Sequence, residues 1–392
     1  MKAVYDNEIK LTKACNAMKV RGIKLNYDYT VKAMEYDLGE LQKEKENFEK
    51  VTGRTFKDSP KLFREVFDEA GETYPRTEKG NPSFKREALE EINTPTATCI
   101  NKIRKIEKKI SSFYTTFLYL ADSNNIIHAS ANSGGTVTGR FSYKEPNLQQ
   151  LSKEDKENDA GKPFYIRGCF EPRPDHFYCA IDYQAQEYRL LVDYAGEKGV
   201  IDAVMAGEDV HQTVADMLGV SRKIAKNCSF AQLYGAGIQK LADMIGCSYE
   251  EAKHLRSLYM ARLPKVKKFI QDVMYVAENR GYIKNRYGRV LRFQRGEEYK
   301  AVNHLIQGTA ADTLKFSLAK IYEQNKLDYF PVTCLIHDEI VLELKEEHTG
   351  VIDSVRDIMS KTYESFDKDL ILETSAEVSR KSMSVWDMQE YV

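Results

Sequence analysis

The stretch DYQAQEYR, residues 182–189, places a carboxylate directly after the continuous apolar run Phe177–Ile181. A run of this kind, without polar alternation, is typical of a strand buried on both faces, so Asp182 is expected where that strand ends. Glu187 and Arg189 follow a few residues later. A carboxylate in such a place is costly unless it is solvated, paired with a cation or bound to a metal. The sequence around Asp182 therefore raises the question of which cation interacts with its carboxylate.

A second acidic pair lies far along the chain, in FPVTCLIHDEIVLELKE, residues 330–346. Two apolar runs joined at His337-Asp338 predict a hairpin whose tip carries Asp338 and Glu339. If this hairpin neighbours the strand of Asp182, at about 4.8 Å between strands, the two aspartates face each other. Two close carboxylates repel, and one keeps its proton unless a cation lies between them.

Two divalent ions about 3.5–4 Å apart would resolve this conflict, and they suit in-line displacement at phosphorus. Oxygen ligands favour Mg²⁺ or Mn²⁺. Taken alone, each aspartate is better explained as the cap of a strand or turn, and His337 as a packed or hydrogen-bonded histidine. The metal hypothesis therefore needs support from elsewhere in the chain.

That support comes from a basic helix in SRKIAKNCSFAQLYGAG, residues 221–237. Ser221 is a good N-cap, and Arg222, Lys226, Phe230 and Tyr234 follow at steps of four on one face, over about 18 Å. Cations in a first turn oppose the helix dipole, whereas a bound polyanion is attracted there. A nucleotide lying along this face, with its triphosphate at the basic end, fits the pattern, and a solvated amphipathic helix is the alternative. Upstream, EDVHQ offers His211 as a further phosphate contact.

The composition restricts what the partner can be. The 392 residues carry a formal net charge of −1, so a nucleic-acid partner would have to meet a local basic surface. No apolar run reaches the length of a membrane span, and the N-terminus lacks a signal-peptide core. Seven cysteines without a CxxC pair indicate reduced thiols rather than a zinc or disulfide framework. The length suggests about two or three domains or subdomains.

Periodicity indicates the architecture. Apolar positions over 30–50 and 97–121 predict two long helices that pack antiparallel as an arm, with loop-rich sequence between them. The second helix carries several lysines and one arginine, for which a solvated face is the favoured interpretation. Further helical patterns run from 187 to 280, YIKNRYGRVLRF predicts a hairpin turning at Tyr287-Gly288, and a helix follows over 298–325. Helices mixed with antiparallel strands indicate an α+β fold.

Taken together and in order, these motifs resemble DNA polymerases of family A, the bacterial DNA polymerase I type common in phages. TGRFSYKEPNLQQL (138–151) resembles the family's TGR-containing segment, and DYQAQEYRLL resembles motif A. RKIAK…F…YG is similar to the motif B helix, NHLIQGTAAD (303–312) to the helix before motif C, and IHDEIVLE to motif C. Motif A usually has Ser-Gln-Ile where this chain has Gln184, Ala185 and Gln186. The resemblance covers residue 10 to the C-terminus.

The resemblance implies a right-hand polymerase fold with an antiparallel palm sheet and a mostly helical thumb and fingers. The implied parts are a lead-in that packs on the palm (1–26), the thumb (27–121), the first palm segment with motif A (122–192), the fingers with motif B (193–300) and the second palm segment with motif C (301–392). The implied reaction is template-directed addition of deoxynucleoside triphosphates to a primer 3′-OH.

The resemblance also implies the roles of single residues. Asp182 and Asp338 would hold two Mg²⁺ ions, with Mn²⁺ as a substitute, and the backbone carbonyl of Tyr183 would complete a metal shell. Arg222, Lys226 and His211 would grip the triphosphate, and Lys226 would protonate the leaving pyrophosphate.

Other residues would bind the nucleoside and the duplex. Phe230 would pack on the incoming sugar, Tyr234 would guard the template base, and Glu187 would block a ribose 2′-OH. Glu339 is expected to be a supporting acid rather than a certain ligand, and Arg189 is expected to support the site. The residues implied to contact the minor groove of the primer–template are Arg140, Asn303, Gln307 and His337.

We further expect a monomer in the cytoplasm of a bacterium or of a phage-infected cell, binding primer–template DNA and dNTPs and no membrane. The thumb pattern begins almost at Met1, so no proofreading exonuclease or 5′ nuclease domain is expected in the chain, and a separate exonuclease or replisome proteins are candidate partners. One alternative is a single-subunit RNA polymerase, which would carry HDS rather than HDE in motif C. The other is a catalytically silent DNA-binding scaffold.

Overall fold

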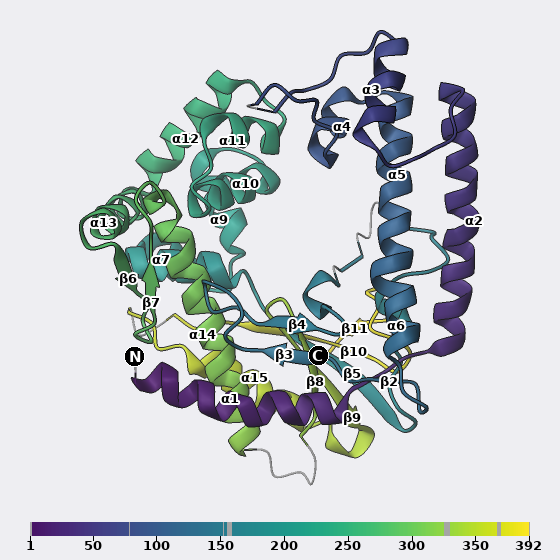
Figure 1. Ribbon diagram of the computed structural model, residues 1–392. Helices are drawn as coiled ribbons and strands as arrows, with labels where there is room; N and C mark the ends of the chain where they lie inside the picture. Colours follow the sequence, from purple (N-terminus) through teal and green to yellow (C-terminus); the bar gives the residue numbers. More distant parts are fainter. Residues whose placement is uncertain are drawn as a thin grey trace.

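The structure is a computed structural model that describes residues 2–77, 79–151, 153–154, 159–324, 330–366 and 370–391. A five-stranded sheet lies at its base, a two-helix arm rises from one side, and a block of helices rises from the other (Figure 1). The sheet orders its strands β11 (Gln389–Glu390), β10 (Thr374–Ser379), β5 (His176–Tyr183), β9 (Glu339–Lys345) and β8 (Val332–Ile336). Neighbouring strands are antiparallel throughout, as expected for an α+β fold.

The central strand β5 is the apolar run that precedes Asp182. It is buried from Phe177 to Ile181, as the sequence predicts. The predicted hairpin is also present, since β8 and β9 pair around His337-Asp338. In the β5–β9 register, Ile181 lies opposite Ile340 and Asp182 opposite Glu339. The two distant acidic stretches therefore meet at one end of adjacent strands.

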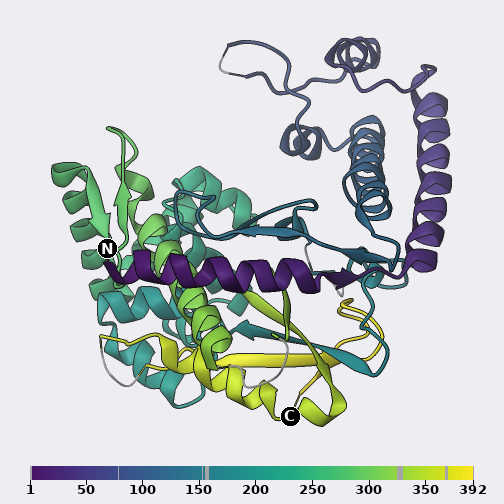
Figure 2. The same cartoon turned by 60° about the horizontal axis from the view of Figure 1, so that its bottom comes forward.

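Three helices complete this part of the molecule: α1 (Lys2–Arg21), α14 (Ala301–Gln324) and α15 (Val351–Thr362). Helix α14 contacts both α1 and α15, and α15 also contacts β10 (Figure 2). Most residues of α14 are buried around its whole circumference, which explains the absence of a clear amphipathic pattern in its sequence. Helix α1 also contacts β8.

The arm consists of α2 (Tyr27–Thr52) packed against a helix that runs from α5 (Pro95–Lys109) into α6 (Thr115–Leu120). The sequence predicted one continuous helix over 97–121, but a π-helical turn, Ile110–Tyr114, interrupts it. Hydroxyls compete with the backbone ladder here, since Ser111 donates to the Glu107 carbonyl at 2.8 Å and Thr116 to the Ser111 carbonyl at 3.0 Å. Tyr114, at the end of this turn, and Phe117 after it are both fully buried.

The tip of the arm has a core of its own. Two short helices, α3 (Pro60–Glu69) and α4 (Arg86–Ile92), join the ends of α2 and α5. Phe67 and Phe84 stack with their ring centroids 5.5 Å apart, and this cluster is separate from the main core. The arm is therefore stabilised as a unit apart from the sheet.

Several basic residues of the arm pair within the arm itself. Lys109 lies 2.7 Å from Asp37, and Lys102 lies 3.2 Å from Glu44. Arg104 donates to both oxygens of Asp58. Lys105 and Lys108 on the same helix are exposed. Part of the basic pattern thus serves the packing of the arm, and part faces solvent.

The remaining elements are short strands and the helical block. The small strands are β1 (Ile23–Lys24), β2 (Ile126–Ile127), β3 (Ser130–Asn132) and β4 (Ser142–Lys144), and the predicted hairpin is β6 (Tyr282–Lys284) with β7 (Val290–Arg292). The block contains α7 (Gln186–Ala195), α8 (Lys198–Met205), α9 (Val210–Leu218), α10 (Arg222–Leu233), α11 (Ile238–Ile245), α12 (Tyr249–Arg262) and α13 (Pro264–Arg280). Short 3₁₀ turns occur at Leu148–Gln150, Arg167–Cys169, Glu298–Lys300 and Glu346–His348.

A buried ionic network fixes the β6–β7 hairpin to α14. Asp312, which is only 1% exposed, accepts hydrogen bonds from Asn285 at 2.6 Å and from Arg289 at 2.6–3.0 Å. Arg289 and the fully buried Lys315 also reach Glu8 of α1, each at 2.7 Å. The network thus ties α1, α14 and the hairpin together.

We predict that Asp312→Ala lowers the free energy of unfolding by about 3–5 kcal/mol, because the substitution leaves a guanidinium without its main partner in a buried place. Urea denaturation would measure the loss. Asp272→Ala is the control, since Asp272 forms only an exposed i,i+4 pair with Lys268 and should change stability by less than about 0.5 kcal/mol. Equal effects in the two variants would contradict this account of the network.

Candidate nucleotidyl-transfer site

The sharp turn after β5 directs the chain from the sheet into the helical block. Gln184 donates its main-chain N–H to the Glu373 carbonyl at 2.9 Å, and Ala185 has the left-handed φ of 47°. Helix α7 begins at the next residue, without a side-chain cap. Ala185 therefore offers no polar side chain here, and the buried amide of Gln186 makes no hydrogen bond among the described residues. The turn leaves Asp182 at the end of the sheet, with its side chain 37% exposed.

The β8–β9 turn brings Asp338 to the same place. His337 has a φ of 57°, and its main-chain N–H donates to the Gln149 side-chain oxygen at 2.8 Å. The amide nitrogen of Gln149 donates to the Leu335 carbonyl at 3.2 Å. Burial lowers the pKa of His337. Gln149 thus holds the tip of the hairpin from the segment that precedes β5.

Acidic and basic side chains alternate around this end of the sheet. Glu339 is buried, and its Oε1 lies 3.1 Å from a nitrogen of the buried Arg167. The Lys153 ammonium lies 2.9 Å from Glu339 Oε2, 3.5 Å from Asp182 Oδ2 and 3.9 Å from Glu377 Oε2. Lys153 is therefore the cation that Asp182 meets in this structure.

Burial, together with the negative charges of Glu339 and Asp338, raises the pKa of Asp182 to about 6. Lys153 acts in the opposite direction. The donor set suits a hard divalent ion, because carboxylate oxygens from three residues converge and Glu339 Oε2, though buried, accepts no hydrogen bond from a described residue. The described residues nevertheless hold no group of three or more His, Cys, Asp or Glu side chains arranged as a complete metal site. Any ion there would need ligands besides protein side chains, such as water or phosphate oxygens.

Helix α10 presents the predicted basic and aromatic face. Ser221 caps it by accepting the main-chain N–H of Ile224 at 3.4 Å. The Lys226 ammonium lies 5.9 Å from the centroid of the Phe230 ring, and the Phe230 and Tyr234 rings stack at 5.8 Å. His211 of α9 adds a third ring 5.9 Å from Phe230. The structure thus brings these four side chains into one row.

Arg222, at the start of the same helix, forms a bidentate ion pair with Asp209, at 3.0 and 2.7 Å. This pair lowers the pKa of Asp209 to about 2. Asp209 also caps α9 by accepting the main-chain N–H of His211 at 3.0 Å. One carboxylate therefore positions both the arginine and the histidine of the predicted phosphate contacts.

A group of hydrogen bonds and ion pairs connects motif A, motif B and motif C. Glu187, 8% exposed, lies 2.5 Å from an Arg140 nitrogen and accepts the Tyr234 hydroxyl at 2.9 Å. Arg140 also lies 3.8 Å from Asp338. Burial raises the pKa of Glu187, and the charge of Arg140 opposes this rise. Four residues predicted from separate motifs are thus linked by direct contacts.

Other predicted residues lie near this group or face away from it. Asn303 and Gln307 lie one turn apart on α14, half-buried, and the Asn303 side-chain oxygen has no hydrogen bond among the described residues. The Tyr183 hydroxyl points into the core, where it lies 3.0 Å from Ser317, which leaves only its backbone for a site. Arg189 faces the C-terminal segment, with Glu373 at 2.5 Å, and so anchors α7 there.

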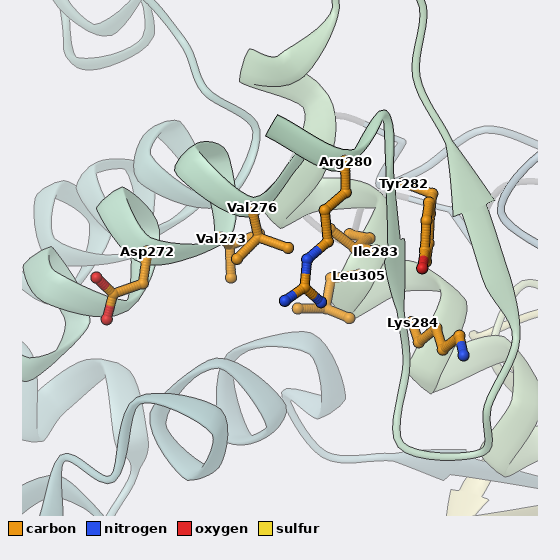
Figure 3. Close-up of a pocket in the computed structure, with 8 residues that line it drawn as sticks. All are labelled: Asp272, Val273, Val276, Arg280, Tyr282, Ile283, Lys284 and Leu305. Atoms are coloured by element: carbon orange, nitrogen blue, oxygen red, sulfur yellow. The ribbon is translucent and has the colours of Figure 1, made fainter. Parts of the chain in front are cut away.

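A separate pocket of about 340 Å³ lies between α13, the β6 strand and the start of α14 (Figure 3). Val273, Val276, Ile283 and Leu305 line it. None of the residues predicted for catalysis or binding contributes to it.

Four residues that form contacts around the site were not predicted from the sequence. Asp209 stands two residues before His211 in EDVHQ and was available as a signal. Lys153 follows the PNLQQ segment closely, but nothing in its immediate sequence shows that it turns toward Asp182. Arg167 and Glu377 carry no local signal, because their roles depend on which strands and loops neighbour β5.

Comparison with known proteins now identifies the family. The profile of DNA polymerase family A matches residues 29–384. The chain belongs to this family. Among solved structures, the POL domain of Pol1 from M. smegmatis, in complex with DNA primer-template and dNTP, superposes with a TM-score of 0.86 at 25% identity, covering 96% of this chain and 70% of that one. The expected right-hand fold is confirmed.

Curated family A relatives include phage and bacterial enzymes. The DNA polymerase of Mycobacterium phage L5 is 28% identical over 345 residues, covering 86% of this chain and 56% of the relative. The thermostable DNA polymerase I of Thermus filiformis is 29% identical over 387 residues, covering 91% of this chain and 45% of the relative. The chain spans about half the length of these relatives and corresponds to their polymerase region.

The environment of His211 predicts a pH effect on stability. Burial lowers the pKa of His211 to about 4, from an ordinary value of 6.5, and Asp209 opposes this shift. Because the unfolded chain binds the proton more readily, the free energy of unfolding falls as the pH drops from about 6.5 towards 4. His211→Gln should remove about 2 kcal/mol of the loss between pH 7 and pH 4.5, as measured by urea denaturation.

The exposed histidine of α12, in the variant His254→Gln, provides the matched control and should lose as much stability as the wild type over this range. If His211→Gln also lost as much, the burial of His211 would not govern its protonation.

Proposed function

We propose that this chain catalyses template-directed DNA synthesis, adding deoxynucleoside triphosphates to a primer 3′-OH. The observation that carries the proposal is the β5–β9 register, which places Asp182 beside the turn that holds Asp338. The side chains of Lys226, Phe230 and Tyr234 on α10 lie next to that end of the sheet, as does Glu187 with its partner Arg140. The fold around them is that of a family A polymerase domain.

The carboxylates of Asp182 and Asp338 would hold two Mg²⁺ ions, or Mn²⁺, together with the Tyr183 carbonyl. Bound there, the ions would lower the pKa of the primer hydroxyl and neutralise phosphate charge. The protein's own part is to keep these oxygens together. Glu339 supports this arrangement, since Arg167 holds one of its oxygens in place.

The row on α10 would bind the triphosphate. Lys226 has no competing ion pair among the described contacts, and its proton is available for the leaving pyrophosphate. Arg222 would exchange or share its contact with Asp209 when a phosphate arrives, because both bind the guanidinium by charge-assisted hydrogen bonds. His211, neutral near pH 7, would donate or accept a single hydrogen bond there.

The nucleoside would lie against the aromatic end of the row. Phe230 would pack on the sugar, and Tyr234 would guard the template base. Glu187 would fill the space of a ribose 2′-OH, and its contacts with Arg140 and Tyr234 make it a fixed barrier rather than a mobile one. This arrangement supports deoxynucleotides as substrates.

The duplex would be held by polar residues near the primer terminus and by the arm. Arg140, Asn303, Gln307 and His337 would contact the minor groove, where bases of either pair offer shared acceptors. Lys105 and Lys108 are exposed on the arm and are available for phosphates. We propose that the chain acts as a monomer in the cytoplasm, and that replisome proteins or a separate exonuclease work with it. Of the helices in the described ranges, none has the length and hydropathy that crossing a bilayer requires.

Removal of either aspartate tests the proposal directly. Asp182→Ala and Asp338→Ala should each reduce magnesium-dependent extension of a 5′-labelled primer at least about a thousandfold, while primer–template affinity stays near that of the wild type. Asp202→Ala, at an exposed position of α8, is the control and should keep full activity. Substantial extension by a folded Asp182→Ala variant would refute the role of the carboxylate.

The same assay addresses the alternatives. With nucleotides omitted, a mismatched primer should keep its length, as expected if these 392 residues contain no nuclease site. Extension with rNTPs alone would instead identify an RNA polymerase, and no extension with any divalent metal would identify a scaffold.

Glu187→Ala tests the choice of sugar. The variant should incorporate ribonucleotides roughly tenfold or more efficiently relative to deoxynucleotides, because the side chain that fills the 2′ position is removed. The measurement is the ratio of kcat/KM for rNTP and dNTP in single-nucleotide extension. Glu278→Ala, exposed on α13, is the control. An unchanged ratio in Glu187→Ala would contradict the steric role.

A further inference from the structure

Lys153 occupies an unusual position among the acids at the end of the sheet. Its ammonium approaches carboxylates from three adjacent strands, with Glu339 Oε2 at 2.9 Å, Asp182 Oδ2 at 3.5 Å and Glu377 Oε2 at 3.9 Å. The ammonium thus lies closest to Glu339 and within ion-pair distance of the other two carboxylates.

The ammonium lies beside Asp182, one of the two proposed metal ligands. An ammonium 3.5 Å from Asp182 Oδ2 opposes the binding of a divalent ion to the same oxygen, because the two cations repel at short distance. Arg167, by contrast, reaches Glu339 at its other oxygen and is buried, so it is a permanent part of the packing. Lys153 is 41% exposed and carried on a flexible four-carbon stem, so its ammonium can leave without disturbing the fold.

We infer that Lys153 is an internal counter-ion that stabilises the metal-free site and competes with the divalent ion for Asp182 and Glu339. In the metal-free enzyme it relieves repulsion among the acids. When the ion binds, the ammonium withdraws into solvent, so Lys153 weakens the affinity for metal and makes loading dependent on its displacement. The inference concerns a positioning residue, and it rests on the proposed function.

Metal binding in the absence of DNA and nucleotides tests the inference. The free Mn²⁺ concentration in titrations of the full chain would be followed by electron paramagnetic resonance, for the wild type, Lys153→Met and the exposed control Lys198→Met. Methionine keeps the length and bulk of the stem and removes the charge. Lys153→Met should bind Mn²⁺ roughly three- to tenfold more tightly than the wild type, given one unit charge removed at this distance from a partly exposed site. Lys198→Met should bind like the wild type.

A second measurement uses the wild type alone and so does not depend on the folding of any variant. Acylation of Lys153 by an amine-reactive reagent, followed by mass spectrometry, should increase several-fold when Mg²⁺ is added, because the ammonium leaves its carboxylate partners. Acylation of Lys198 should stay constant. Tighter Mn²⁺ binding and increased acylation support the inference. Unchanged or weaker binding by Lys153→Met, or acylation that does not respond to Mg²⁺, would overturn it.

Asp182→Asn separates this inference from the proposed function. If Asp182→Asn leaves Mn²⁺ binding unchanged, the aspartate holds no ion and the proposed metal site is wrong. If it weakens binding while Lys153→Met has no effect, the metal site stands and only the role of Lys153 fails.

Discussion

The antiparallel pairing of β5 with β9 is the constraint on which the rest of the site depends. Its register sets Asp182 opposite Glu339 and therefore next to Asp338, although more than a third of the chain separates them. A slip of one residue would turn Asp182 to the opposite face of the sheet. The apolar pairs behind the acids, such as Ile181 with Ile340, oppose this slip, because both faces of these strands are buried and a shifted register would disrupt close packing on each face. The packing of the core therefore fixes the position of the charged groups at the end of the sheet.

Nearby cations then stabilise these carboxylates in the folded chain. Arg167 neutralises Glu339 permanently, Arg140 joins Glu187 to Asp338, and Lys153 fills the remaining space beside Asp182. Arg167 is buried, whereas Arg140 and Lys153 are both about 40% exposed, so burial separates the fixed Arg167 from the two cations that can move. The same logic applies to the helical block, where Asp209 pairs with Arg222, the residue proposed to bind a phosphate. The site is therefore a set of ion pairs, some of them structural and some exchangeable for ligand.

The sequence predicted the parts of this site that depend on local pattern. The buried run before Asp182, the hairpin at His337-Asp338 and the row from Arg222 to Tyr234 follow from periodicity and capping, and all are present. The π-helical turn at Ile110–Tyr114 was missed because hydroxyl competition with the backbone leaves no periodic signature. Lys153 and Glu377 were missed because their contacts require knowing that β10 pairs with β5, a long-range fact with no local signal. The predicted role of each residue in binding remains a prediction.

The central claim is that Asp182 and Asp338 together hold divalent ions at the point of nucleotide addition. Anomalous diffraction from crystals of the chain with primer–template, dNTP and Mn²⁺ would test it most directly. The account predicts anomalous peaks within bonding distance of an oxygen of each aspartate, with Lys153 moved away from them. Peaks bound to only other residues, or aspartates too far apart to share an ion in that complex, would contradict it.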